Sequence, residues 1–328
     1  MNMFIFASML GFEMKAVYRE VYGPPEVLEL KEIEKPVPMD NEILMKVHAA
    51  SVNRADSHGM RGTPFMARII LGGLRKPKTK ILGYDFAGQV ESVGKDVTEF
   101  KQGDEVFGTN KVAGGFAEYL CVLEDLMLIK PPNVSFEDAA SVPGAGVTAL
   151  QCLQKYGEMQ SGEDVLINGA SGGVGTLAVQ IAKDKGATVT GVCSTSNLDM
   201  VRSLGADEVI DYTKENFTQS EQRYDLIVDV VAKSSFSDCK PILNSNGRYV
   251  TTEFSPGLAI KAKTARGDKK FLPMLASPEK DDLIYLKDLL ESGKLKPVID
   301  QRYSLDKVPD AIRYLEEGHV KGKLIINM

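Results

Sequence analysis

The 328-residue sequence has no hydrophobic run long enough to cross a membrane. Its longest run, residues 3–12, has about ten residues and is interrupted by Ser8, whereas a membrane-spanning helix needs roughly 20. The sequence also lacks an excess of positive charge: 39 lysines and arginines face 45 aspartates and glutamates, which leaves a net charge of −6. Because negative charge repels phosphate backbones, we expect no general nucleic-acid binding.

Cysteine is scarce, and the few cysteines are far apart. They are Cys121, Cys152, Cys193 and Cys239. They form neither a Cys-x-x-Cys metal motif nor the disulfide framework of a small secreted protein. Residues 1–13 are apolar but have no basic region and no clear cleavage site, so we interpret them as an extension before a strand that starts at Met14. These features predict buried free thiols and a cytoplasmic location.

The pattern along the chain changes from β-like to alternating strand and helix. At roughly 150 residues per domain, the length predicts about two domains. The first third has short β-like runs, such as residues 43–49 and 87–93, separated by glycines, which is typical of a small barrel or sandwich. From Pro143 onward short apolar strands alternate with helical patterns, which predicts an α/β domain with a doubly wound parallel sheet. The tail has helical patterns near residues 282–291 and 309–317 and ends in a strand-like run, residues 323–327.

A glycine-rich turn marks the chemistry of the second part. Residues 169–175 read GASGGVG, after a predicted strand at residues 164–168 and before a predicted helix at residues 176–185. Such a turn lets the backbone approach a pyrophosphate at the N-terminus of the helix, so it predicts a dinucleotide site. The contacting residues we expect are Gly169, Ser171, Gly172, Gly173 and Val174. The alternative is a glycine-rich turn in an unrelated α/β fold, which the second strand at residues 187–193 disfavours.

The end of that second strand lacks the acidic residue that selects NAD. The segment from Cys193 reads CSTSN, and the first carboxylate, Asp199, already belongs to the next helix. Small hydroxyls and an amide suit a ribose 2′-phosphate, so we predict NADP as cofactor, with Ser194 and Asn197 among its contacts. The alternative is an ordinary polar loop.

Residues 162–183, GEDVLINGASGGVGTLAVQIAK, resemble the signature of the quinone oxidoreductase (zeta-crystallin) branch of the medium-chain dehydrogenases/reductases. Further similar motifs cover almost the whole chain from Met14: YGPPEVLEL, ASVNRAD, GYDFAGQVESVG, GDEVFG, GGFAEY, PGAGVTAL and KGKLIINM. Within that branch the chain is similar to the zinc-free NADPH reductases akin to the mitochondrial reticulon-interacting oxidoreductase. The resemblance implies a GroES-like β-barrel catalytic domain, residues 1–139 and 277–328, and a Rossmann domain, residues 140–276.

The resemblance also shows which zinc ligands are missing. Zinc-dependent members of the superfamily use a cysteine, a histidine and a second cysteine, where this chain has Asn53, Tyr84 and Gly144. None of these residues completes a tetrahedral zinc site. The histidines are too scattered to form another site, so we expect no metal. They are His48, His58 and His319.

The resemblance implies that two residues take over the role of the metal at the acceptor oxygen. By resemblance Asn53 faces the cofactor and the substrate, where its amide would donate to a carbonyl oxygen as negative charge develops. The alternative role is to stabilise a turn. Tyr84, at the place of the zinc-binding histidine, is a candidate proton donor or an aromatic wall. Asp56 is expected to pair with a nearby donor such as Arg61.

Two more contacts come from the resemblance alone. Thr148 resembles a threonine beside the nicotinamide, and Tyr212 resembles a tyrosine near the adenosine phosphate. Relatives often carry a lysine or an arginine close to Ser196 or Asn197, and this chain does not.

Together these features predict an NADPH-dependent oxidoreductase that transfers hydride to a quinone or an α,β-unsaturated carbonyl without a metal. One alternative is an enoyl-thioester reductase of the same superfamily, which the segment SHGMRGTP after Asn53 disfavours because it lacks the tyrosine of those enzymes. The other is an NADPH-binding sensor or structural protein with little turnover. The expected partner is a small molecule, with no nucleic acid and no membrane span, and a homodimer is compatible with this interpretation.

Overall fold

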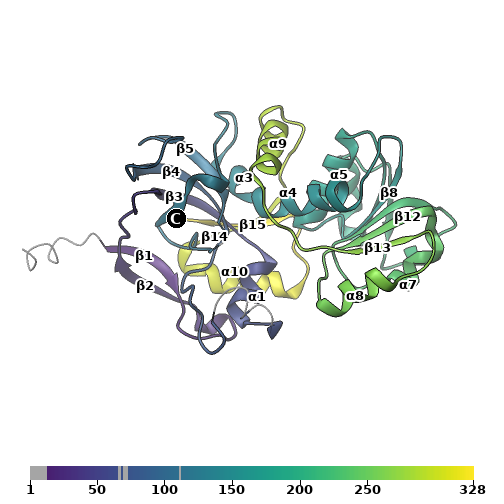
Figure 1. Cartoon of the computed structure of the whole chain (residues 1–328), viewed down its shortest axis with the longest axis horizontal. Helices are drawn as coiled ribbons and strands as arrows, with labels where there is room; N and C mark the ends of the chain where they lie inside the picture. Colours follow the sequence, from purple (N-terminus) through teal and green to yellow (C-terminus); the bar gives the residue numbers. More distant parts are fainter. Residues whose placement is uncertain (1–12, 66–67, 69–72, 111) are drawn as a thin grey trace, which may run out of the picture. The chain divides into compact units, whose positions relative to one another are not determined.

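The chain forms two compact units in a computed structural model that describes residues 13–65, 68, 73–110 and 112–328 (Figure 1). The first unit runs to Gly144 and takes up Ile299–His319 and Lys323–Met328. The second contains Ala145–Val298 and Val320–Gly322. The domain boundaries implied by the resemblance stay a prediction; the second unit of the structure also includes the segment 277–298. The predicted N-terminal extension lies outside the described residues, apart from Glu13.

The first unit is built mainly of strands. They are β1 (Glu13–Tyr18), β2 (Glu29–Glu34), β3 (Glu42–Val52), β4 (Asp85–Val93), β5 (Glu105–Thr109), β6 (Tyr119–Leu123), β7 (Met127–Ile129), β14 (Ile299–Ser304) and β15 (Lys323–Asn327). β1 pairs with β2, and the others form a seven-stranded sheet in the order β14-β15-β3-β4-β5-β7, with β6 paired to β3. The β-rich first part predicted from the sequence is therefore confirmed.

Strand β3 is the centre of this unit because it is apolar along most of its length. Ile43, Met45 and Val47 are almost completely buried and pack with Phe86 of β4 and Val106 of β5. Alternate side chains of a strand point to the same face, so the predicted alternation places these residues in one core. β3 ends at Val52 and delivers Asn53 to the start of helix α1.

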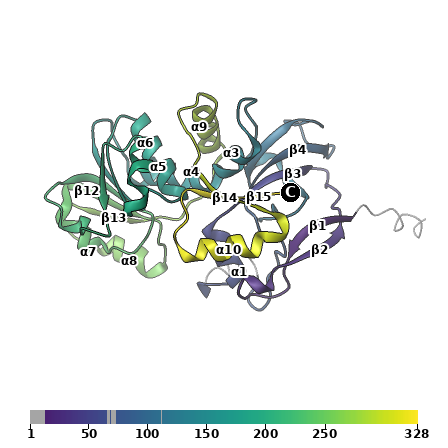
Figure 2. The ribbon, with the colours of Figure 1, turned by 180° about the vertical axis from the view of Figure 1, so that it is seen from behind.

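The helices of the first unit lie around the sheet. They are α1 (Arg54–Arg61), α3 (Phe136–Ser141) and α10 (Val308–Glu317), and α4 (Pro143–Leu150) begins in this unit and continues into the second. Figure 2 shows α10 next to α1. Glu316 of α10 accepts hydrogen bonds from Ser57 at 2.6 Å and from Arg61 at 2.5 and 2.6 Å, so these two distant helices are held together.

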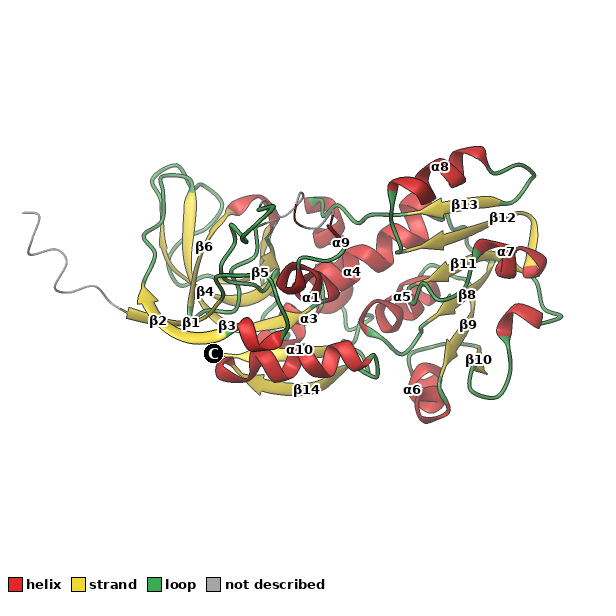
Figure 3. Cartoon of the chain, turned by 90° about the horizontal axis from the view of Figure 1, so that it is seen from below, coloured by secondary structure: helices red, strands yellow, loops and turns green. Residues whose placement is uncertain are grey.

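The second unit is a parallel sheet with helices between its strands (Figure 3). Its strands are β8 (Asp164–Asn168), β9 (Thr188–Cys193), β10 (Glu208–Asp211), β11 (Tyr224–Asp229), β12 (Leu243–Thr251) and β13 (Lys270–Pro273). Its helices are α5 (Gly173–Asp184), α6 (Leu198–Ser203), α7 (Phe236–Cys239), α8 (Pro256–Thr264) and α9 (Lys280–Glu291). The predicted alternation of strand and helix is confirmed.

The strand order of this sheet, β10-β9-β8-β11-β12-β13, reverses direction at β8. Crossovers between parallel strands are right-handed, so α5 and α6 lie on one face, and α7 and α8 on the other, as Figure 2 shows. In such sheets ligands bind at the carboxyl ends of the strands next to the reversal.

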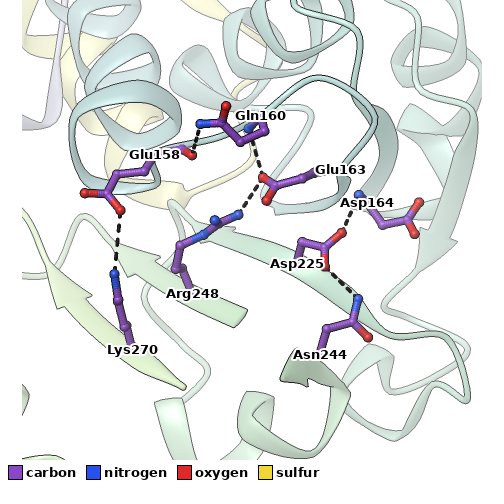
Figure 4. A network of polar contacts seen from close by, with 8 residues as sticks. All are labelled: Glu158, Gln160, Glu163, Asp164, Asp225, Asn244, Arg248 and Lys270. Atoms are coloured by element: carbon purple, nitrogen blue, oxygen red, sulfur yellow. Dashed lines mark hydrogen bonds and ion pairs between the residues drawn. The ribbon is translucent and has the colours of Figure 1, made fainter. Parts of the chain in front are cut away.

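The opposite edge of this sheet is closed by polar contacts (Figure 4). Arg248 of β12 donates to Glu163 at 2.5 Å, and Asp225 accepts from the backbone N–H of Asp164 at 3.0 Å and from Asn244 at 2.8 Å. These contacts tie the amino ends of β8, β11 and β12 to one another. The carboxyl edge therefore remains as the place for a ligand.

Candidate active site and nucleotide site

The loop between β8 and α5 has the shape of a pyrophosphate cradle. Gly169 has φ +88°, a conformation that favours glycine, and its N–H donates to Val192 of β9 at 3.1 Å. A Cβ at Gly175 would lie 2.0 Å from the carbonyl oxygen of Gly169, so only glycine lets the helix approach the loop. A Cβ at Gly172 would meet nothing closer than 3.6 Å, so internal packing does not require glycine there. The open space in front of Gly172 fits a bound group.

The N-terminus of α5 supplies what a phosphate needs. Gly172 is the N-cap and offers no side chain, so no side-chain cap covers the start of the helix, and the N–H groups of its first turn, such as that of Val174, point toward the space in front of it. The helix dipole adds positive potential at the same point. The carbonyl of Ser171 accepts from the N–H of Gly322 at 2.8 Å, which fixes the loop from the side. These residues fit a dinucleotide pyrophosphate, as predicted from the glycine motif.

Ser194 and Asn197 lie together at the end of β9. Asn197 Nδ2 donates to Ser194 Oγ at 3.1 Å, and Ser196 Oγ lies 3.4 Å from Ser194 Oγ. Asn197 is buried, yet its Oδ1 has no hydrogen-bond partner among the described residues. The backbone N–H of Tyr212 donates to Cys193 at 3.1 Å, and the Tyr212 side chain is 56% exposed. The sequence-predicted 2′-phosphate contacts are thus neighbours in the second unit.

A carboxylate that the sequence analysis missed lies beside this group. Asp211 ends β10 and accepts hydrogen bonds from Thr195 and, at 2.6 Å, from Thr213. Lys214 Nζ lies 3.4 Å from the same carboxylate. The hydrogen bond from Thr195, followed by that from Thr213, holds the pKa of Asp211 below its ordinary value. Lys214 is therefore a basic residue near the end of β10, although no lysine or arginine lies next to Ser196 or Asn197 in the sequence.

A buried polar group marks the reversal of strand order. Asp229, at the carboxyl end of β11, accepts from Asn168 Nδ2 of β8 at 2.9 Å and from the Tyr249 hydroxyl at 2.7 Å. The N–H groups of Val231 and Ala232 donate to the same carboxylate at 3.0 and 2.9 Å. Asp229 thereby fixes the loop after β11 at the ligand edge. Sequence signals for it existed, since Asn168 and Asp229 are polar residues that end apolar strands.

Thr148 and Tyr84 are both half-buried, in different units. Thr148 lies on the part of α4 that belongs to the second unit. Tyr84 lies in the first unit, directly before β4. Burial of the Tyr84 ring, and secondarily the nearby charge of Asp56, raises the pKa of its hydroxyl. Tyr84 is therefore a protonated phenol at neutral pH.

Asn53 is held by residues that the sequence analysis did not single out. Lys323 Nζ donates to Asn53 Oδ1 at 2.5 Å, and Asn53 Nδ2 donates to Asp85 Oδ2 at 3.0 Å. Asn53 Nδ2 also lies 3.4 Å from the carbonyl oxygen of Ser51. Asp85 and Lys323 are buried, with exposed fractions of 0% and 4%. The sequence does contain a signal for both residues: Asp85 begins the run DFAG and Lys323 begins the run KLIIN, so each is a charged residue at the edge of an apolar strand.

The expected pairing of Asp56 with Arg61 is wrong. Asp56 accepts from the backbone N–H groups of Asn53 and Gly83, each at 2.8 Å, and Arg61 pairs with Glu316 instead. The reason is that Asp56 is fully buried on one side of α1, whereas Arg61 is on the exposed side of the same helix. Burial raises the pKa of Asp56 to about 7, and repulsion from Asp85 acts in the same direction.

Gly144, at the third zinc-ligand position, lies against the carboxylate of Asp85. The N–H of Gly144 donates to Asp85 Oδ2 at 3.0 Å, and a Cβ at Gly144 would lie 2.8 Å from that oxygen. A side chain at this position would therefore collide with the Asp85 carboxylate. Within residues 13–65, 68, 73–110 and 112–328, no three His, Cys, Asp or Glu side chains are grouped so that they could hold a metal ion.

Comparisons with known proteins match both units. Residues 39–133 match the model described as "Alcohol dehydrogenase GroES-like domain", and residues 204–326 match "Zinc-binding dehydrogenase". The fold predicted from the sequence, a GroES-like domain and a parallel-sheet Rossmann-like domain, is confirmed.

Whole-length relatives are also found. The chain is 35% identical to the chloroplastic NADPH-dependent alkenal/one oxidoreductase of Arabidopsis thaliana, over 96% of this chain and 79% of that protein. It is 34% identical to the mitochondrial NAD(P)H oxidoreductase RTN4IP1 of Bos taurus, over 96% and 89%. A solved structure, the quinone oxidoreductase from Coxiella burnetii, is 35% identical, with a TM-score of 0.87 and coverage of 96% and 99%.

No helix in the described part of the chain is both long enough and apolar enough to span a bilayer.

Proposed function

The chain belongs to the quinone oxidoreductase branch of the medium-chain dehydrogenases/reductases, and we propose that it transfers a hydride from NADPH to a quinone or an α,β-unsaturated carbonyl without a metal ion. The observation that carries the proposal is the cradle at the start of α5 together with β9, which is followed directly by Ser194 rather than by a carboxylate. Relatives named for quinones and for alkenals support the substrate class.

We assign the cofactor to residues of the second unit. The N–H groups at Gly173 and Val174 would hold the pyrophosphate, and the loop from Gly169 to Gly172 would make room for it. Ser194 and Asn197 would hold the 2′-phosphate, with Tyr212 beside them. Thr148 stays a predicted contact of the nicotinamide.

We assign the acceptor oxygen to Asn53. Its Nδ2 has two hydrogens, and one is used by Asp85 at 3.0 Å. The other has only the 3.4 Å contact with the carbonyl oxygen of Ser51, longer than an ordinary hydrogen bond, so a substrate oxygen near the plane of the fixed amide would compete for it. A donor aimed at developing negative charge lowers the barrier. The protonated hydroxyl of Tyr84 is the proposed second donor.

The proposal is tested by NADPH oxidation across a panel of quinones, enals, enones and one enoyl thioester, each compared with NADH. We expect turnover with quinones or enones and a preference for NADPH. Turnover confined to the thioester would establish the enoyl-reductase alternative. Tight NADPH binding with no turnover on any compound would establish the sensor or structural alternative.

Two broader predictions accompany the activity. We propose a cytoplasmic location, which fluorescence microscopy of a tagged full-length chain in its own cells tests, since two of the relatives are named as chloroplastic and mitochondrial. We also propose a homodimer, which light scattering of the purified protein tests.

A further inference from the structure

We propose that Lys323 is a positioning residue that fixes the orientation of the Asn53 amide for the reaction. This inference rests on the proposed function, because it gives Asn53 the role of donor to the acceptor oxygen. Lys323 itself would touch neither cofactor nor substrate.

The register of the sheet brings Lys323 to Asn53. β15 pairs antiparallel with β3, with Leu324 opposite Val52 and Ile325 opposite Ser51. Continuing the register by one residue sets Lys323 opposite Asn53. Lys323 Nζ then donates both to Asn53 Oδ1 at 2.5 Å and to the carbonyl oxygen of Val52 at 3.2 Å.

Lys323 and Asp85 together specify one orientation of the amide. An asparagine amide has nearly the same shape after a half-turn, so packing alone cannot tell its oxygen from its nitrogen. An ammonium group only donates, and a carboxylate only accepts. Turning the Asn53 amide over would set its NH₂ against the Lys323 ammonium and its oxygen against Asp85. The observed arrangement is therefore the one in which the Nδ2 hydrogens are directed away from Lys323.

The cost of burying Lys323 argues that its partners matter. Removing an ammonium group from water is unfavourable, and burial lowers the pKa of Lys323 accordingly. A second buried lysine in the same unit, Lys130, has an evident structural role, because its Nζ donates to Val134 at 2.6 Å and to Pro131 at 3.1 Å and pairs with Glu105 at 3.0 Å. No donation from Lys130 to a proposed site residue is found among these contacts. Lys130 is thus a matched control for the loss of a buried ammonium group.

The kinetic test uses four full-length variants: Lys323→Met, Lys130→Met, Asn53→Ala and the double variant of Asn53→Ala with Lys323→Met. With NADPH and the best acceptor of the panel, we expect Lys323→Met to lower kcat at least tenfold and to change the Kd of NADPH less than threefold. Both lysine variants should lower Tm by similar amounts, because each loses a buried ammonium group. Lys130→Met should nevertheless keep the kcat of the wild type. In the double variant kcat should equal that of Asn53→Ala, because a positioning residue has nothing left to position. An unchanged kcat in Lys323→Met, or losses that multiply in the double variant, would overturn the proposal.

A second readout does not depend on turnover. In protein labelled with 15N-asparagine, the side-chain signal of Asn53 is the one missing in Asn53→Ala. We expect its hydrogen exchange to be slow in the wild type and in Lys130→Met, and at least tenfold faster in Lys323→Met. Exchange that Lys323→Met leaves unchanged would refute the positioning role. If the wild type reduces no compound of the panel, the proposed function fails, while this exchange rate still decides whether Lys323 holds the amide.

Discussion

In the proposed cofactor site, Ser194 places a neutral hydroxyl next to the ribose, where an NAD-dependent enzyme has a carboxylate. Replacing it by aspartate would set a carboxylate against the 2′-phosphate. At about 4 Å and an effective dielectric near 20 the repulsion is about 4 kcal/mol per charge pair, and solvent and salt reduce it to roughly 1.4–2.8 kcal/mol. Ser194→Asp should therefore weaken NADPH ten- to hundredfold and improve the use of NADH, whose 2′-hydroxyl gains an acceptor.

The measurement is kcat/KM for both cofactors in the wild type and in Ser194→Asp. Ser203→Asp, which adds the same charge at an exposed position near the end of α6, is the control and should leave the ratio unchanged. A wild type that prefers NADH, or a ratio that Ser194→Asp does not move, would place the ribose elsewhere.

Asp56 predicts a pH dependence of stability. Burial raises its pKa from 3.8 to about 7, so the folded state keeps a proton that the unfolded state releases above pH 4. The contribution of Asp56 to stability is therefore greatest below pH 4 and falls as the pH rises toward 7, by up to about 4 kcal/mol at 1.36 kcal/mol per unit. Denaturant unfolding from pH 4 to 8 should show this decline in the wild type and in the control Asp96→Asn, which removes an exposed carboxyl group, and a flatter curve in Asp56→Asn. Parallel curves for all three proteins would contradict the shifted pKa.

At the scale of the element, α5 and the loop before it give two glycines different roles. Gly175 lies against the carbonyl of Gly169, so Gly175→Ala should push the helix away and lower Tm. Gly172 lies at open space with φ −85°, which alanine adopts freely. We expect Gly172→Ala to keep Tm within about 2 °C and to weaken NADPH at least tenfold, measured by fluorescence titration. If Gly172→Ala binds NADPH as the wild type does, the cofactor does not use this space.

Elements were predictable where the pattern that makes them is local. β8, α5 and β15 bury apolar residues at regular spacing; β8 and β15 have the predicted bounds, and α5 begins at Gly173, before its predicted start at residue 176. Helix α8 buries no residue, so it had no periodic pattern to find. Asn246 and Gly247 form a local pair typical of a turn, yet both lie within β12, where Asn246 has φ +61°. The loop residues and Ser194 with Asn197 were proposed from spacing along the chain and stay predictions, whereas the contact of Lys323 with Asn53 joins residues 270 positions apart and required the sheet register.

For the whole molecule, the replacement of all three zinc-ligand positions predicts metal-independent activity. Asn53 and Tyr84 supply neither thiolate nor imidazole, and Gly144 has no room for a cysteine because the Asp85 carboxylate is against it. The Lys323 ammonium, donating to Asn53 at 2.5 Å, would also repel a divalent cation there. The match to a family model named for zinc makes this prediction worth a direct test.

The test is elemental analysis of the purified protein and activity after exhaustive treatment with a chelator. We expect zinc far below one ion per chain and an unchanged kcat, and added zinc should bring no gain. A zinc-dependent alcohol dehydrogenase treated in parallel should lose its activity, which proves that the chelator works. Stoichiometric zinc in this protein, or activity that chelation removes and zinc restores, would mean that a metal takes the role we assign to the amide of Asn53.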